Sequence, residues 1–341
     1  MSANLKDQAQ WEASPLAFLS RQFIQGVPRI PSTVNLSGQT ALITGSNVGL
    51  GFECARQLLA LNLSHLIIAV RSQARGDAAA KKLQTEFPNA KIEVSLVDMS
   101  SYRSIQDFAK RCESLPRLDI AILNAGLSRP KFERDDETKH EMTVQINYLS
   151  TALLTILLVP ILKEKRGAGS PGRLAVVGSD MAYWAKWDHP DNVPIFDVLD
   201  NASNFSSTEA YKMSKFFLLF FIEKLSHLVS ADEVIINFPN PGACRGTQFG
   251  SDGRSGIGKV LFWIASHIVA KPVSAGARSY VDAVTVKGAE SHGGFVGEGK
   301  VKPLAPIMYE EAGHALQERA WNETMNELNF ANPLEILKGI A

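Results

Sequence analysis

The stretch Ala41-Leu42-Ile43-Thr44-Gly45-Ser46-Asn47-Val48-Gly49-Leu50-Gly51 joins a short apolar run to a glycine-rich turn. The run is typical of a strand buried on both faces, and the residues up to Leu61 have helical periodicity. Glycine permits a tight turn and lets a phosphate approach the backbone at the helix N-terminus. We therefore expect strand, turn and helix in the arrangement that binds the pyrophosphate of a dinucleotide. An ordinary strand-to-helix turn is the alternative.

Apolar runs and helical periods alternate along the rest of the chain. Further strands are expected at residues 66–70, 92–97, 120–123, 174–177, 234–238 and, from a weaker pattern, 295–301. Helical periods fall between them, for example at residues 74–87 and 104–112. This alternation predicts an α/β fold, a single Rossmann-type domain with a doubly wound parallel sheet and helices on both faces.

No Pro/Gly/Ser linker divides the 341 residues, so we expect one folded domain. Residues 1–37 are assigned to an N-terminal extension, 38–330 to the Rossmann-fold domain and 331–341 to a C-terminal tail. Within the domain, glycines between positions 250 and 258 precede the apolar run 260–264. A mobile glycine-rich segment followed by an apolar run predicts a substrate lid at about 243–275. A helix packed permanently on the sheet is the alternative.

Composition favours a small-molecule partner. Thirty-five basic residues balance thirty-five acidic ones, which leaves no basic field for nucleic acid or an anionic membrane. Three widely spaced cysteines argue against a disulfide framework and fit a reducing cytoplasm. The seven histidines lack metal-ligand spacing, so no metal is expected. No apolar run reaches 18 residues, so no integral membrane segment is expected.

Two apolar features of the sequence are expected to be buried against another surface. The N-terminal extension has one apolar helix face, which we expect to pack on the domain, with membrane or partner contact as the alternative; it consists of Trp11, Leu16, Phe18, Leu19 and Phe23. The expected helices around 153–162 and 216–222 are too apolar for any face to be solvated. A second subunit would cover them in a homodimer, or the N-terminal extension would do so in a monomer.

The pair Tyr211 and Lys215 carries the chemistry. Of the six tyrosines, only Tyr211 has lysine four positions later, a spacing that puts both side chains on one helical face. A cation beside a phenol favours the phenolate and lowers a pKa that starts near 10. Such a tyrosine can exchange protons nearer neutrality, as carbonyl reduction requires. Downstream of the glycine turn, the pair predicts a nicotinamide-dependent oxidoreductase.

Further residues at strand ends fit a bound dinucleotide. Arg71 directly follows an expected strand, where an acid would contact the ribose 2′-hydroxyl of NAD(H). A guanidinium there suits a 2′-phosphate, which favours NADPH/NADP+, although a solvated charge is the alternative. Asp98 is placed to cap a turn or contact the adenine. Asn124-Ala125-Gly126 could brace the sheet edge against the cofactor.

With these motifs in order, residues 38–300 resemble the short-chain dehydrogenase/reductase superfamily. The resemblance is greatest to its longer, retinol-dehydrogenase-like branch, which contains many fungal reductases of secondary metabolism. It implies a cofactor loop formed by Gly45, Ser46, Asn47, Val48, Gly49, Leu50 and Gly51. It also implies a catalytic tetrad of Asn147, Ser179, Tyr211 and Lys215. Pro241, Gly242 and Thr247 would border the nicotinamide.

Two departures from the family pattern stand out. Gly178 precedes the serine where many relatives carry a second serine, a change expected to matter little. Relative to the family pattern, one residue is inserted between Gly242 and Thr247, which weakens the expectation that this threonine borders the nicotinamide.

The implied mechanism makes Tyr211 the general acid in reduction and the general base in oxidation. Lys215 would lower the pKa of the phenol and hold the nicotinamide ribose, and Ser179 would donate to the substrate oxygen. Asn147 would hold a water that links Lys215 to solvent.

The expected activity is NADPH-dependent reduction of a ketone or aldehyde on a hydrophobic small molecule, with a secondary metabolite such as a polyketide as one candidate. The aromatic stretch 181–205 would wall the substrate pocket, unless its rings belong to the core. Oxidation of a lipidic, retinol-like alcohol and a cofactor-binding regulator without turnover are the alternatives.

Overall fold

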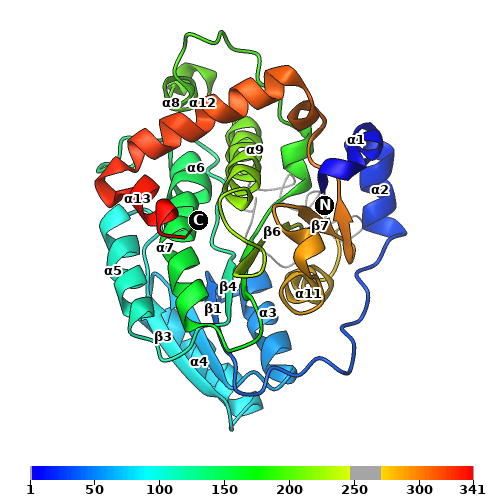
Figure 1. The fold of residues 1–341 in the computed structure, drawn as a ribbon, viewed down its shortest axis with the longest axis vertical. Coiled ribbons are helices and arrows are strands. Elements are labelled where there is room, and N and C mark those ends of the chain that lie inside the picture. Colours follow the sequence, from blue (N-terminus) through cyan, green and yellow to red (C-terminus); the bar gives the residue numbers. More distant parts are fainter. Residues whose placement is uncertain (1, 246–269, 341) are drawn as a thin grey trace, which may run out of the picture.

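The computed structural model describes residues 2–245 and 270–340, and its centre is an eight-stranded sheet in the order β3-β2-β1-β4-β5-β6-β7-β8 (Figure 1). The strands from β1 to β7 pair in parallel, and β8 runs antiparallel to β7. Their bounds are β1 Thr40–Thr44, β2 His65–Val70, β3 Lys91–Leu96, β4 Ile120–Leu123, β5 Gly172–Val176, β6 Val234–Pro239, β7 Phe295–Gly297 and β8 Lys300–Lys302. This topology confirms the doubly wound α/β fold.

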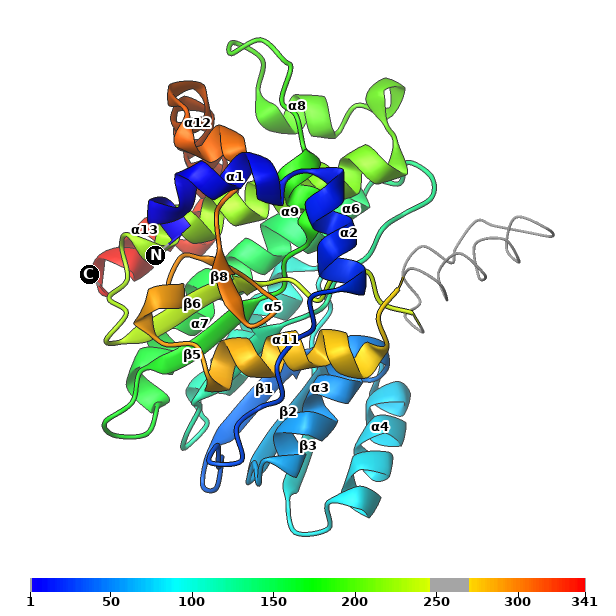
Figure 2. The ribbon, with the colours of Figure 1, turned by 90° about the vertical axis from the view of Figure 1, so that its right-hand side faces the viewer.

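Helices cover both faces of the sheet, and each face has its own hydrophobic core. One face is covered by α3 Gly49–Ala60, α4 Gln73–Glu86 and α11 Val273–Thr285, with α3 and α11 side by side (Figure 2). The other is covered by α5 Tyr102–Glu113, α7 Thr151–Lys165 and α9 Ser207–Ser226. The fully buried β1, β2, β4 and β6 therefore have apolar neighbours on both sides, as their continuous apolar sequences predicted.

Shorter segments complete the fold. The helical ones are η1 Ser2–Leu5, α1 Lys6–Glu12, α2 Pro15–Phe23, α6 Met142–Val144, η2 Gln145–Ser150, η3 Asp180–Trp184, α8 Ile195–Leu199, η4 Ala202–Asn204, η5 Ala289–Ser291, η6 Pro306–Tyr309, α12 Glu311–Glu327, η7 Asn329–Ala331 and α13 Pro333–Lys338. Most of the expected lid, from 246 to 269, lies outside the described residues.

One expected strand is instead a hairpin. Residues 295–301 were expected to be continuous, but they form β7, a two-residue turn and the start of β8. The turn residues Glu298 and Gly299 have φ values of 48° and 72°. Two consecutive positive φ values are typical of the tight turn that reverses a strand, so the chain folds back and β8 closes the sheet.

The apolar helices α7 and α9 are covered by the C-terminal helices of the same chain (Figure 1). The helix α12 packs on α9, where Trp321 stacks on Phe221 with ring centroids 5.5 Å apart, and α13 packs on α7. Residues 142–165 are long and apolar enough to cross a membrane, but 89% of their most apolar window is buried in the protein. Neither a second subunit nor the N-terminal extension is therefore needed to bury these helices.

The N-terminal helices are oriented opposite to expectation. The apolar side chains of α1 and α2 were expected to pack on the domain, yet most of them are exposed, among them Leu16 at 65% and Phe23 at 55%. The buried side chains on these helices include Glu12, Arg21 and Gln22. The physical reason is that the surface beneath α2 contains buried charges and backbone groups that need polar partners.

Candidate active site

The glycine turn follows β1 and opens α3, as predicted. Gly45 and Gly49 have φ values of 67° and 62°, which other residues rarely adopt. A Cβ atom on Gly51 would lie 2.6 Å from the side-chain nitrogen of Asn124 and 2.7 Å from the carbonyl oxygen of Gly45. The turn therefore requires glycine at these positions, for backbone conformation at two and for close packing at the third.

The Asn124-Ala125-Gly126 segment after β4 braces this turn. Asn124 Nδ2 donates to the carbonyl oxygens of Thr44 at 2.9 Å and Gly45 at 3.2 Å. The backbone N–H of Ala125 donates to Thr44 Oγ1 at 3.0 Å. These bonds join the ends of β1 and β4, so the glycine turn is held from the neighbouring strand.

The turn leaves donor groups available for a phosphate. The N-cap of α3, Val48, makes no side-chain capping bond, so no side chain caps the first N–H groups of the helix. Gly49 adjoins open space, since a Cβ atom there would have no atom within 4 Å. A helix N-terminus without a side-chain cap, next to backbone that has open space around it, is suited to binding a pyrophosphate. Ser46 is buried and its hydroxyl donates to the carbonyl oxygen of Ile43, so its side chain serves the turn itself.

Arg71 and Asp98 follow the carboxyl ends of two neighbouring strands. Arg71 directly follows β2, is exposed, and no hydrogen bond or ion pair joins its side chain to another described residue. Asp98 lies beyond β3, where Oδ1 accepts from the backbone N–H of Ser100 at 3.0 Å and from its hydroxyl at 2.7 Å. Arg71 thus remains available to a ligand, while one oxygen of Asp98 stabilises a turn.

Ser179, Tyr211 and Lys215 meet at the carboxyl end of β5. Ser179 lies at the start of η3, near enough to Tyr211 for its side chain to lower the pKa of the phenol. Lys215, one helical turn further along α9, lies with Nζ 6.0 Å from the centre of the Tyr211 ring. Its Nζ donates to the carbonyl oxygen of Val177 at 2.8 Å. The predicted spacing of four residues therefore does place both side chains together.

The electrostatics of the pair differ from expectation. Lys215 was expected to lower the pKa of Tyr211, but burial raises the pKa of that phenol to about 12, and the smaller opposing effect comes from the Ser179 side chain. Burial also lowers the pKa of Lys215 to about 8. The reason is that Nζ is directed to Val177, so desolvation outweighs the attraction between cation and phenolate.

Asn147 lies in a π-helical turn, η2, and is completely buried. Its side-chain amide donates to the carbonyl oxygen of Leu127 at 2.8 Å and to Ser214 Oγ at 3.1 Å, and its oxygen accepts from the N–H of Leu127 at 2.9 Å. Both amide hydrogens are thus used by protein groups. The observed role of this side chain is to fix the chain after β4 beside α9.

Asn240, which sequence reasoning missed, organises the turn after β6. Its Oδ1 accepts from the N–H of Gly242 at 3.1 Å and from the N–H of Asp180 at 3.3 Å. Gly242 has a φ of 70°, which favours glycine. Asn240 therefore links the Pro241-Gly242 turn to the residue after Ser179, and its position just before this motif was the available signal. Thr247 lies outside the described residues.

The aromatic stretch contributes mainly to packing. Tyr183 stacks on Phe295 with centroids 4.7 Å apart, and Trp187 packs against Phe217 at 5.3 Å. Trp184 packs against the core and donates from its ring nitrogen to the carbonyl oxygen of Ala13 at 2.8 Å. Tyr183 belongs to the core, and Trp184 and Trp187 are partly buried against it. A role of this stretch in walling a substrate pocket stays a prediction.

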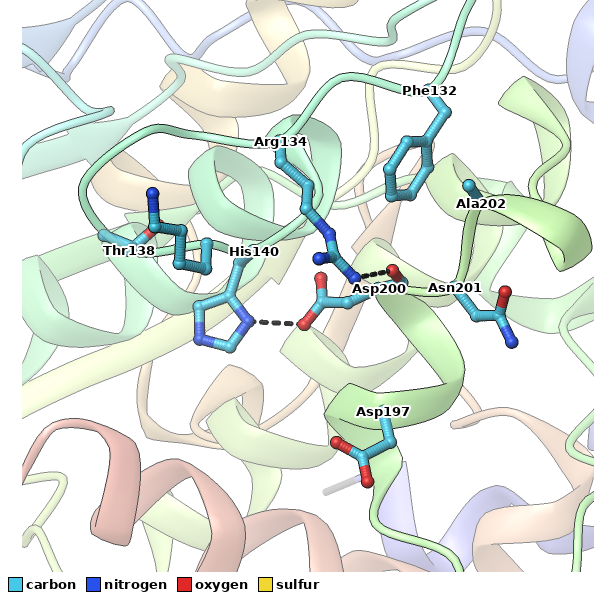
Figure 3. A pocket seen from close by; sticks show the side chains of 9 residues that line it. Phe132, Arg134, Thr138, His140, Asp197, Asp200, Asn201 and Ala202 are labelled. Atoms are coloured by element: carbon cyan, nitrogen blue, oxygen red, sulfur yellow. Dashed lines mark hydrogen bonds and ion pairs between the residues drawn. The ribbon is translucent and has the colours of Figure 1, made fainter.

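A separate cavity of about 680 Å³ lies between the loop after β4 and the region around α8 (Figure 3). Its residues are Phe132, Arg134, Thr138, Lys139, His140, Asp197, Asp200, Asn201 and Ala202. His140 Nδ1 lies 2.7 Å from Asp200 Oδ2, and Nε2 lies 3.3 Å from Glu327 Oε1. No residue of the predicted tetrad lines this cavity. The charged groups of the cavity instead join two loops to α12.

The fold and the grouped side chains define an oxidoreductase of the Rossmann type. The chain belongs to the short chain dehydrogenase family, whose model matches residues 39–185. It is 45% identical to the short chain dehydrogenase virL of Hypocrea virens over 100% of this chain and 99% of that protein. It is 47% identical to the short chain dehydrogenase opdN of Penicillium oxalicum over 89% of this chain and 100% of that protein. These relatives confirm the predicted family and enzyme class.

A solved structure shares the fold. NADPH-dependent 3-quinuclidinone reductase from Rhodotorula rubra superimposes with a TM-score of 0.58 at 19% identity, covering 81% of this chain and 98% of the other.

Proposed function

We propose that this enzyme reduces a ketone or aldehyde on a hydrophobic small molecule, with NADPH as the hydride donor and Tyr211 as the general acid. The observation that carries the proposal is the grouping of Ser179, whose side chain acts on the pKa of the Tyr211 phenol, with Tyr211 and with Lys215 one helical turn away. A carbonyl oxygen placed between the two hydroxyls would receive a hydrogen bond from Ser179 and a proton from Tyr211.

The chain offers suitable groups for each part of the cofactor. The uncapped start of α3 would hold the pyrophosphate, and Arg71 would pair with the 2′-phosphate. Lys215 and the turn at Pro241-Gly242 would lie beside the nicotinamide end. When bound, NADPH supplies the hydride, and the protein contributes binding, orientation and the proton.

The raised pKa of Tyr211 suits reduction. A phenol with a pKa of about 12 stays protonated at neutral pH, so it can donate as negative charge develops on the carbonyl oxygen. The Ser179 side chain, which acts to lower the pKa of Tyr211, favours the phenolate that remains afterwards. Lys215, whose pKa burial lowers to about 8, lies beside Tyr211 on the same helix and would take part in returning a proton.

An apolar substrate is supported by the groups around Ser179. Met181 and Leu127 are half-buried, and their backbones are bonded to Ser179 and Asn147. Apolar residues thus adjoin Ser179 and Asn147, which favours an apolar substrate. A secondary metabolite such as a polyketide is the substrate class we propose.

The decisive experiment measures binding and turnover separately. NADPH fluorescence reports binding, and loss of NADPH absorbance with a panel of ketones and aldehydes reports turnover. Tyr211→Phe should reduce turnover by about 100-fold or more while the NADPH dissociation constant stays within a few-fold. Tyr102→Phe, which removes a phenol hydroxyl hydrogen-bonded to Glu327, is the matched control and should retain activity. Retained turnover in Tyr211→Phe would refute the proposed acid, and binding without turnover in the parent would favour a regulator.

A further inference from the structure

The N-terminal helix α2 contributes two buried polar side chains to the region of Ser179. Arg21 is 1% exposed and Gln22 is 7% exposed, although both precede the Rossmann-fold domain in sequence. Burying an arginine and a glutamine is unfavourable unless they gain polar partners. Their partners identify what α2 does.

Arg21 connects the extension to the residue after Ser179. Its Nη1 lies 2.5 Å from Glu12 Oε2, and its Nη2 lies 3.3 Å from Asp180 Oδ1. The backbone of Asp180 is held from the other side, because its N–H donates to Asn240 Oδ1. The start of η3, which directly follows Ser179, is therefore held by a charge from α2 and by the amide of Asn240 in the turn after β6.

Gln22 pairs with the turn after β6. Its Nε2 donates to the carbonyl oxygen of Ala243 at 3.1 Å, and its Oε1 accepts from the N–H of Ala243 at 3.2 Å. A side-chain amide that satisfies both backbone groups of one residue fixes the position of that residue. Ala243 directly follows Pro241-Gly242, so Gln22 holds the turn proposed to border the nicotinamide.

The charges around Arg21 form a buried, balanced network. Lys302 Nζ lies 2.9 Å from Glu12 Oε1, and Lys271 Nζ lies 3.0 Å from Glu298 Oε1. Its members are three acids and three bases, Glu12, Asp180, Glu298, Arg21, Lys271 and Lys302. Removing one member leaves a buried charge without compensation. Loss of Arg21 would thus act on Asp180 and Glu12.

We propose that α2 is a working part of the active site, in which Arg21 and Gln22 are positioning residues. Arg21 holds Ser179 in place through Asp180, and Gln22 holds the Pro241–Ala243 turn. The inference rests on the proposed function, since it assigns these residues to the same hydride-transfer site. Displacement of a reacting group by about 1 Å can lower a rate by about 100-fold, so small movements of Ser179 would be measurable.

The test combines kinetics with hydrogen exchange. The variants are Arg21→Met, which keeps length but removes charge, Arg21→Lys, which restores charge, and Gln22→Leu. Arg29→Met, an exposed arginine in the same extension, is the matched control. Turnover is measured with NADPH and an aromatic ortho-quinone, and hydrogen exchange is followed without NADPH in residues 178–184 and 240–245.

We expect Arg21→Met to lower kcat by about tenfold or more with a smaller change in KM, because Ser179 acts as charge develops. Arg21→Lys should recover part of that loss, which a purely structural packing role would not produce. Gln22→Leu should raise the NADPH dissociation constant several-fold. Exchange should become faster at 178–184 in Arg21→Met and at 240–245 in Gln22→Leu, while Arg29→Met resembles the parent in every measurement.

Turnover and exchange within twofold of the parent in both Arg21→Met and Gln22→Leu would overturn the inference. If Arg21→Met does not fold, Arg21→Lys and Gln22→Leu decide the question by the same measurements. A parent that binds no NADPH or reduces no carbonyl would refute the proposed function instead, and the hydrogen exchange of the variants would still report whether α2 holds these two segments.

Discussion

A Cβ atom on Gly178 would lie 2.1 Å from the ring of Phe238, too close for any side chain to fit between β5 and β6. The glycine that departs from the family pattern is therefore required by the buried phenylalanine opposite, which in turn contacts Phe295 with ring centroids 5.7 Å apart. Gly178 directly precedes Ser179, so this packing relationship also sets where the serine lies.

Introducing a serine at position 178 should disrupt the site. Gly178→Ser should lower the free energy of unfolding by about 1 to 3 kcal/mol through overpacking, and should lower turnover because Ser179 is displaced. Phe238→Leu, combined with Gly178→Ser, should recover part of both losses. Denaturant unfolding and carbonyl reduction measure this in a double-mutant cycle, and additive losses would disprove the steric link.

The glycine turn should not tolerate alanine. Gly51→Ala should weaken NADPH binding by about tenfold or more, because the added Cβ meets the Asn124 side chain and the Gly45 carbonyl. Gly26→Ala is the control, since no atom lies within 4 Å of its added Cβ. Fluorescence titration of NADPH measures the difference, and equal dissociation constants in the two variants would contradict this account of the turn.

Arg71 should determine the choice of cofactor. Arg71→Asp should reverse or abolish a preference for NADPH, because a carboxylate repels the 2′-phosphate and accepts a hydrogen bond from a free 2′-hydroxyl. Arg29→Asp makes the same charge change at another exposed position and should leave the preference intact. The ratio of kcat/KM for NADPH and NADH is the measurement. A parent with equal values for both cofactors would show that Arg71 does not select the phosphate.

His140 should make stability depend on pH. Burial lowers the pKa of His140, but hydrogen bonds to Asp200 and Glu327 outweigh it and raise the pKa from 6.5 to about 9. The folded state therefore binds the proton more tightly. The resulting stability, on the order of 2 to 3 kcal/mol, is fully present below about pH 6.5 and is lost as pH rises through about 9.

His140→Gln should remove this dependence. Its free energy of unfolding should vary less than that of the parent between about pH 6.5 and 9. His314→Gln, a histidine on the exposed side of α12, is the control and should retain the parent's slope. Parallel curves for His140→Gln and the parent would show that this histidine does not bind its proton as described.

Trp321 should be the main anchor of the C-terminal cover. Trp321→Ala should lower the free energy of unfolding by about 3 to 5 kcal/mol, because it removes the ring stacked on Phe221. Leu334→Ala, at a side chain that is 50% exposed, should cost about 1 kcal/mol or less. Light scattering should show increased self-association of Trp321→Ala, since α9 loses part of its cover. Similar stability losses in both variants would argue against this role.

Much of the fold could be predicted because its signals are local. The buried strands have continuous apolar runs, and the glycine turn and the Tyr211–Lys215 spacing depend on backbone geometry over a few residues. Those interpretations agree with the observed strands and with the meeting of Tyr211 and Lys215. The hairpin at Glu298 was missed because its two short strands resemble one longer run.

The environment of Tyr211 and Lys215 could not be predicted from spacing. The pKa of Tyr211 depends on how deeply the phenol is buried and on the direction of the Lys215 side chain. The direction of the Lys215 side chain depends on the carbonyl of Val177. The pKa of Tyr211 depends also on Ser179, which lies outside α9. Distances between elements, rather than positions in sequence, determine which effect is larger.

By itself, the sequence determined the class of fold and the position of its glycine turn, because apolar periodicity and backbone freedom act over neighbouring residues. Only the tertiary structure decided which face of α2 is buried. Arg21 and Asp180 are far apart in the chain, yet they form one ion pair inside the protein. Helical periodicity identifies two faces but not the surface each will meet, and here that surface consists of buried charges that need polar partners.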